Sequence, residues 1–138
     1  METIAKPGTL DACNDLCDNL SEAEDEMARE MVARVADKWS LWTMGVLADA
    51  ASPVRFSKIM ERVEGVSQKS LTKTLRQLER DGLVTRKVFA EVPPRVEYAM
   101  TPLGIEMLEH VQPLWLWAAR SVGRFQSARA SFDARSLA

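Results

Sequence analysis

The sequence has too few cysteines and histidines for the sites that those residues usually build. Its 138 residues include two cysteines, Cys13 and Cys17, and one histidine, His110. Two cysteines do not make the disulfide framework of a small secreted domain. A single histidine supports neither a histidine-based metal site nor a Ser-His-Asp triad. No run approaches the roughly 20 apolar residues of a membrane span, and the first residues lack a secretory pattern. We therefore expect a cytoplasmic protein that is not an enzyme and has no cofactor, bound metal or membrane partner.

Composition and charge favour a folded protein with an anionic partner. Hydrophobic residues make up 46% and charged residues 28% of the chain, which excludes intrinsic disorder. The length suits one compact domain with helical extensions. Residues 1–50 hold four Lys/Arg against eleven Asp/Glu, whereas residues 51–100 hold ten against six. The anionic partner is therefore expected to bind the middle segment.

The first fifty residues have the periodicity of helices with acidic outer faces. Apolar side chains recur at steps of three and four residues, first at Leu10, Cys13, Cys17 and Leu20 and then at Ala23, Met27, Met31 and Val35. Ser21 and Glu24 have capping-box spacing, so a helix is expected to restart there. Residues 38–50 predict a buried helix, ended by Ser52 and Pro53, whose apolar face carries Trp39, Trp42 and Val46.

The middle segment has the layout of a helix-turn-helix followed by a hairpin. A short helix that Gly65 ends is predicted by the spacing of Phe56, Ile59, Met60 and Val63. A second helix is expected over 67–81, with Ser67 as its N-cap and Gly82 beyond its C-terminus. Residues 83–91 and 95–100 have strand character, with two prolines between them. This order is typical of a winged helix.

A last long helix is expected to begin at Thr101 and Pro102, a hydroxyl cap followed by proline. Its apolar stripe is wider than a small winged helix can cover, and it consists of Leu103, Met107, Val111, Leu114, Ala118, Val122 and Phe125. Pro113 is expected to bend or split this helix near Gln112. The tail from Ser127 to Ala138 is expected to fray.

The second helix of the helix-turn-helix has side chains suited to a DNA major groove. Leu71, Leu75 and Leu78 share one face and point into the core. The opposite face and the N-terminal end carry Ser67, Gln68, Lys69, Thr72, Lys73 and Arg76. Lys and Arg donate to guanine or phosphate, Gln bonds adenine, and Thr contacts a base edge or a thymine methyl. In an isolated helix, such a polar face is more often an ordinary solvated surface. Its place after a short helix and before a hairpin favours DNA binding instead.

The hairpin adds Arg86, Lys87 and Arg95. Basic side chains on such a wing enter the adjacent minor groove or contact phosphates. Arg95, which follows the tip, is the first candidate for that contact. The alternative is that Arg95 pairs with Glu97 or Glu91 and only solubilises the turn.

Short sequence motifs give a further indication of the protein family. They are Lys38-Trp39, the segment ERDGLV at 79–84 and the string EVPPRVEYAMTPLG at 91–104. Together with the helix-turn-helix between them, they resemble the HxlR-type winged-helix transcriptional regulators of bacteria, over about residues 38–118. The resemblance implies a homodimer that binds an inverted repeat in double-stranded DNA. It also implies a recognition helix at 67–81, a wing at 83–100 and dimer contacts from the terminal helices.

The expected fold is mainly α with a small β-hairpin: a winged helix-turn-helix domain with N- and C-terminal dimerisation helices. We expect an acidic helical extension at 1–37, the DNA-binding domain at 38–101, and a dimerisation helix with its tail at 102–138. The predicted dimer interface consists of Leu20, Met27, Met31, Val111, Leu114, Trp115, Val122 and Phe125. A winged-helix module that binds proteins, without sequence-specific DNA binding, is the alternative.

Two sets of residues have two interpretations each. Cys13 and Cys17 share a helix face, where thiolates would bind a soft metal or be oxidised, but nearby aspartates should raise their pKa, so apolar packing is preferred. Trp39, Trp42 and Trp115 would line a pocket for a small-molecule effector. Core and dimer packing is the alternative for these tryptophans.

Overall fold

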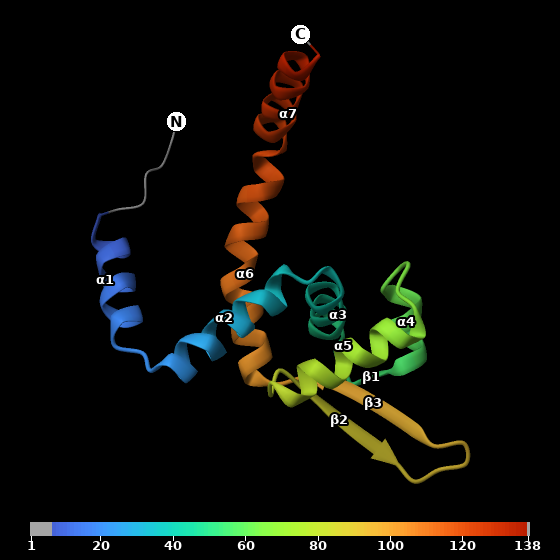
Figure 1. Cartoon of the computed structure of the whole chain (residues 1–138). Helices are drawn as coiled ribbons and strands as arrows, with labels where there is room; N and C mark the ends of the chain where they lie inside the picture. Colours follow the sequence, from blue (N-terminus) through green and yellow to red (C-terminus); the bar gives the residue numbers. More distant parts are fainter. Residues whose placement is uncertain (1–6, 138) are drawn as a thin grey trace. The chain divides into compact units, whose positions relative to one another are not determined.

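The computed structural model describes the backbone of residues 7–137 and the side chains of residues 13–137. It is mainly helical, with one small antiparallel sheet. The chain forms two compact units, Met1–Lys38 and Trp39–Ala138. The second unit contains the helix-turn-helix and the hairpin (Figure 1).

The first unit consists of α1 (Pro7–Asp18) and α2 (Glu22–Ala36). The predicted restart is confirmed, because Ser21 is the N-cap of α2 and its hydroxyl accepts a hydrogen bond from the Glu24 N–H at 3.2 Å. Acidic residues occupy the first turn of α2, where they complement the helix dipole. None of the residues of α2 is buried, so this helix lacks a covered apolar face within the chain as described.

Helix α3 (Lys38–Asp49) buries a different face from the predicted one. Its buried residues are Ser40, Thr43, Met44 and Leu47. Trp42 is 45% exposed, Trp39 and Val46 are half-buried, and the two indole rings stack with centroids 6.3 Å apart. The small Ser40 and Thr43 allow close packing of the helix, which leaves the bulky rings at the edge of the core. The expectation of a buried tryptophan face was therefore wrong.

The helix-turn-helix is confirmed, and one strand precedes it that the sequence did not predict. This strand, β1 (Val54–Arg55), leads directly into α4 (Phe56–Arg62), and α5 (Gln68–Arg80) follows. The Ser67 hydroxyl caps α5 by accepting from the Ser70 N–H at 3.1 Å. At the other end Gly82 has φ of 76°, and the Leu83 N–H bonds to the Leu78 carbonyl at 3.0 Å. This Schellman closure ends α5 sharply.

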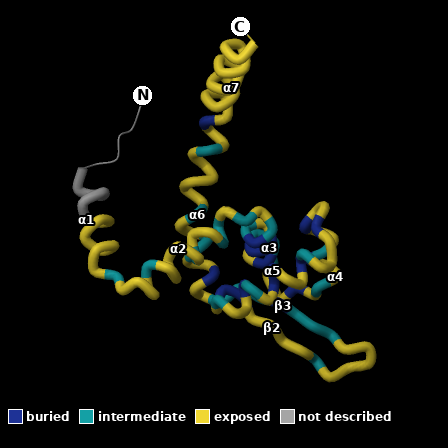
Figure 2. Tube along the Cα trace, viewed as in Figure 1, coloured by how far each residue is buried: buried dark blue, intermediate teal, exposed yellow. Residues whose placement is uncertain are grey.

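The wing consists of β2 (Val84–Phe89) and β3 (Arg95–Met100), which pair antiparallel in a sheet of order β1-β3-β2. The core of the second unit lies between this sheet and helices α3 to α5, as Figure 2 shows. It consists of Met44, Leu47, Val54, Ile59, Val63, Val66, Leu71, Leu75, Leu78, Leu83, Val84 and Tyr98.

Helix α6 (Pro102–Arg120) is fixed at its start to the turn after α5. The Thr101 hydroxyl donates to the Gly82 carbonyl at 2.6 Å and accepts from the Gly104 N–H at 3.0 Å. Gly104 is buried, and a Cβ at this position would collide with the Leu83 carbonyl oxygen. Only glycine fits this close approach of two backbones.

The C-terminal part differs from expectation in two ways. Helix α6 does not split near Gln112; it continues through Pro113 to Arg120, and the break falls at Ser121 before α7 (Val122–Ser136). The other expected effect of Pro113, a bend, stays a prediction. The tail is helical instead of frayed. Proline removes one hydrogen bond from a helix whose neighbouring turns keep theirs. The tail is rich in Ala and Arg, which favour helix even where no apolar period exists.

Candidate nucleic-acid interface

Six predicted DNA-contacting residues lie together at the N-terminal end and on the outer face of α5. All six are exposed, whereas Leu71, Leu75 and Leu78 on the inner face are at most 1% exposed. We call the outer set the α5 basic face; it consists of Ser67, Gln68, Lys69, Thr72, Lys73 and Arg76. The helix is thus fixed through its leucines and presents its polar face to solvent.

The cations of the α5 basic face are not neutralised inside the protein. Among the residues that the structure describes, no carboxylate forms an ion pair with Lys69, Lys73 or Arg76. The Thr72 hydroxyl, by contrast, donates to the Gln68 carbonyl at 2.8 Å. Its proton is committed, so Thr72 offers a partner only an oxygen lone pair and a methyl group.

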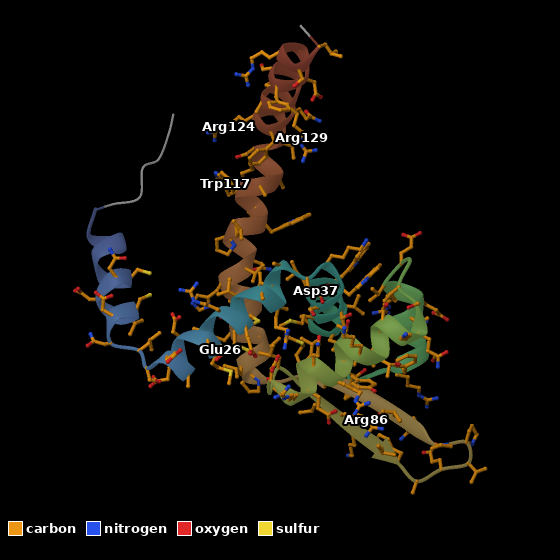
Figure 3. The ribbon with its side chains drawn as sticks, in the orientation of Figure 1. Glu26, Asp37, Arg86, Trp117, Arg124 and Arg129 are labelled. Atoms are coloured by element: carbon orange, nitrogen blue, oxygen red, sulfur yellow. The ribbon has the colours of Figure 1, made fainter. Side chains whose placement is uncertain are left out.

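The register of the wing places its three predicted contact residues on two different faces. Arg86 lies opposite Tyr98, which faces the core, whereas Lys87 lies opposite Glu97, and Phe89 lies opposite Arg95. Because side chains alternate along a strand, Arg86 shares the sheet face that α5 packs against. Lys87 and Arg95 share the other face. Figure 3 labels Arg86 on the sheet of the wing.

On the second face of the wing, Arg95 is held by its neighbours. Its Nη1 lies 3.2 Å from Glu91 Oε1 and its Nε lies 3.9 Å from Glu97 Oε1. The guanidinium also stacks 4.0 Å above the centre of the Phe89 ring, and Lys87 Nζ lies 5.0 Å from that ring. The Arg95 side chain is only 26% exposed. The ion pairs of the alternative interpretation are therefore present in the structure, while a DNA contact by Arg95 stays a prediction.

A further basic group escaped the sequence analysis. Arg55, Lys58 and Arg62, from β1 and α4, line a depression of about 470 Å³ together with Ser52, Ser57 and Asp49. Lys58 pairs with Glu61 at 3.3 Å, but Arg55 and Arg62 form no ion pair among the described residues. The first helix of a helix-turn-helix crosses the DNA backbone. The basic residues at 55, 58 and 62 were the signal that was available in the sequence.

Several residues of the predicted dimer interface have large exposed apolar side chains in the chain alone. On α6, Leu114 is 57% and Trp115 65% exposed. Of the others, Met27, Val122 and Phe125 are exposed, and Leu20, Met31 and Val111 are half-buried. The list missed Leu116, Trp117 and Phe132, which are also exposed; the Trp117 and Phe125 rings meet edge to face at 5.6 Å. Large exposed apolar side chains in this number on α6 and α7 are typical of an interaction site.

The predicted effector pocket gains no support from the cavities. The depressions found in the described part of the chain lie around 49–62 and around the wing tip, and no tryptophan lines them. Trp39 and Trp42 stack on each other, and Trp115 is 65% exposed. The pocket stays a prediction.

Cys13 and Cys17 do not pack in an apolar core, so that expectation was wrong. Both are exposed on α1. A hydrogen bond with the Cys13 thiol is the main cause that raises the pKa of Cys17, and Asp25 and Asp18 raise it further. The sequence predicted this direction from nearby aspartates, and Asp18 contributes to the raised pKa of Cys17.

None of the described helices is long and apolar enough to cross a membrane. Within the same part of the chain, no group of three or more His, Cys, Asp or Glu residues is arranged to hold a metal ion.

Known proteins resemble this chain over the same region as the fold described above. Residues 34–125 match the family model for HxlR-like helix-turn-helix proteins. The HTH-type transcriptional regulator YtfH of Escherichia coli is 37% identical over 95 residues, covering 69% of this chain and 74% of that protein. The regulator YkvN of Bacillus subtilis is 36% identical over 92 residues, covering 67% and 74%.

Solved structures give the same result. The transcriptional regulator ytfH from Salmonella typhimurium superposes with a TM-score of 0.66 at 33% identity, covering 75% of this chain and 90% of that chain. The reduced form of the transcriptional regulator YodB from B. subtilis has a TM-score of 0.59 at 30% identity, covering 72% and 92%.

Proposed function

Because the chain belongs to the HxlR-like helix-turn-helix family and is a DNA-binding transcriptional regulator, we propose that it binds an inverted-repeat operator as a homodimer. The observation that carries this proposal is the α5 basic face, whose three cations have no carboxylate partner among the described residues. Unpaired cations on a projecting helix are available to phosphates and base edges.

In this proposal α5 enters the major groove with its N-terminal residues towards the bases. Gln68 and Lys69 lie in the first turn of α5 and Arg76 lies two turns further on. Arg76 donates to guanine, because its guanidinium matches the O6 and N7 acceptors of that base. Thr72, whose hydroxyl proton is already committed, contacts a thymine methyl. Lys69 and Lys73 bind phosphate or guanine.

The wing and α4 supply contacts to the backbone. Arg86, which shares the α5 side of the sheet, is the better wing contact, because Arg95 would have to leave Glu91 and the Phe89 ring. Arg55 and Arg62 add phosphate contacts from the first helix of the motif. In this proposal Arg86 is a stronger candidate for a DNA contact than Arg95. All residues of the predicted site are kept.

The dimer brings two α5 helices to successive major grooves, about 34 Å apart. Exposed Leu114, Trp115 and Trp117 on α6 and Phe125 on α7 support an interface built by residues 102–138. Figure 3 labels one of them, Trp117, on α6. Met27 is an exposed apolar side chain of the acidic extension at 1–37. Domain 38–101 then holds all the DNA contacts. A signal would regulate binding by changing the distance or angle between the two α5 helices.

The test uses an operator obtained by selecting bound fragments from genomic DNA with the full chain. Binding of the operator and of a scrambled duplex is measured by fluorescence anisotropy for the native chain, for the double variant Lys69→Ala with Lys73→Ala, and for a control on α7. The control, Arg129→Ala with Arg135→Ala, also removes two positive charges from exposed positions. We expect operator affinity to fall for the lysine variant and to stay within about twofold for the control, since α7 makes no DNA contact in this proposal. Equal, unchanged affinity for all three would contradict the proposal and favour a module that binds proteins.

A further inference from the structure

Cys13 and Cys17 have no part in the function proposed above, and they precede the residues that match the family, 34–125. They lie four residues apart on α1 and both are exposed. Residues at this spacing lie above one another on the same helix face. The Cys13 thiol is also the main influence that raises the pKa of Cys17. Two thiols that face solvent together are available to a common ligand.

The geometry of α1 disfavours a disulfide between Cys13 and Cys17 but permits a metal ion to bridge them. Side chains four residues apart on a helix have Cβ atoms about 5–6 Å apart, whereas a disulfide needs about 3.5–4.5 Å. A disulfide between Cys13 and Cys17 would therefore require α1 to unwind. A metal ion with two bonds of about 2.3 Å to sulfur spans thiols up to about 4.6 Å apart, so an ion bridges them without disturbing the helix.

The charge and the ligands around the two thiols favour some metal ions over others. Asp25 and Asp18 raise the pKa of Cys17, so the free pair keeps its protons. The same negative charge attracts a divalent cation, which displaces those protons when it binds sulfur. A divalent cation and two thiolates also give a neutral product, which avoids adding negative charge to an acidic segment. The described residues offer no group of three ligands for a metal ion. This disfavours Zn²⁺, because its structural sites take four protein ligands. Thiolate ligands favour soft ions.

We propose that Cys13 and Cys17 form a two-thiolate site for a soft divalent cation, such as Cd²⁺ or Hg²⁺, on the exposed face of α1. Both S–H bonds break, two metal–sulfur bonds form and two protons pass to water. No electrons are transferred, so binding needs no oxidant. Water completes the coordination of the ion. The site does not depend on DNA binding, and either proposal can fail without the other.

The experiment titrates the full chain with Cd²⁺ in the absence of oxygen and of added thiols. Ultraviolet absorption of the thiolate–cadmium bond reports binding, and calorimetry in buffers of different ionisation enthalpy counts the protons released. We expect one Cd²⁺ per chain and two protons per ion. Cys13→Ser and Cys17→Ser should each weaken binding at least a hundredfold, with helix content by circular dichroism unchanged.

A matched control keeps two thiols but separates them. In the double variant Asp15→Cys with Cys17→Ser, the thiols are two residues apart and lie on opposite sides of α1; it should bind Cd²⁺ as weakly as the single variants. If this variant or either single variant binds within threefold of the native chain, the proposal is overturned. One ion for every two chains would also overturn it, because the site would then lie between chains.

Discussion

At the scale of single residues, the basic side chains differ in whether they already form an ion pair with a carboxylate. Arg95 is paired with Glu91, and its guanidinium stacks on Phe89. Arg76 and Arg86 form no ion pair with any described carboxylate. A paired guanidinium has to give up its partner before it binds phosphate, whereas an unpaired one gives up only water. Unpaired exposed cations are therefore the stronger candidates for DNA contacts.

Arg76→Ala should reduce affinity for the preferred operator by about 1–3 kcal/mol if the guanidinium donates to a guanine. The loss should be larger for the operator than for random duplex, and specificity should relax at one base position. Competition binding against operators with single base changes measures both effects. An equal loss on every duplex would identify Arg76 as a phosphate contact instead.

Arg86→Ala and Arg95→Ala should differ in what they change. Arg86→Ala should reduce the slope of log affinity against log salt by about 1, the effect of one phosphate contact. Arg95→Ala should leave that slope nearly unchanged and lower stability by about 0.5–2 kcal/mol, since it removes an ion pair and a cation–π contact. Thermal unfolding and salt titration distinguish the two. A reversed result would assign the wing contact to Arg95.

At the scale of elements, the sequence predicted those whose ends carry a chemical signal. Ser21, Ser67 and Thr101 all cap helices through their hydroxyls, and Gly82 ends α5 with positive φ. Strand β1 was missed because two residues give no periodicity. The buried face of α3 was misassigned because the tightness of packing, rather than hydrophobicity, decides that Ser40 and Thr43 are inside. Face assignment on such a helix needs the neighbouring elements.

The junction of α6 with the α5–β2 turn allows a test with an internal control. Gly104→Ala should destabilise the chain by about 1–3 kcal/mol, because its Cβ would strike the Leu83 carbonyl. Gly123→Ala should be neutral or stabilise by up to about 1 kcal/mol, since nothing lies within 4 Å of its Cβ and alanine favours helix. Urea unfolding measures both changes. Equal effects would show that the close approach at Gly104 is not a constraint.

At the scale of the whole molecule, the exposed apolar surface of α6 and α7 has to be explained. Figure 2 shows these helices exposed along most of their length. The sequence predicted the stripe on α6 and its continuation to Val122 and Phe125, which lie on α7. It missed the exposed Phe132 further along α7, because the polar tail after Ser127 has no apolar period.

Polar replacement of this surface should abolish the dimer. The double variant Leu114→Gln with Trp115→Gln should be a monomer by light scattering, with weak operator binding, because two linked half-site contacts become separate events. The affinity for a single half-site should stay within about threefold of the native value. A dimer of unchanged mass would remove α6 from the interface.

The central claim is that the basic surface formed by α5 and the wing binds a specific duplex. The most direct measurement is the affinity of the full chain for the selected operator and for a scrambled duplex over a series of salt concentrations. We predict that the operator binds at least about a thousandfold more tightly, and that both affinities fall steeply as salt rises. Equal affinity for the two duplexes, or affinity that does not change with salt, would contradict the claim.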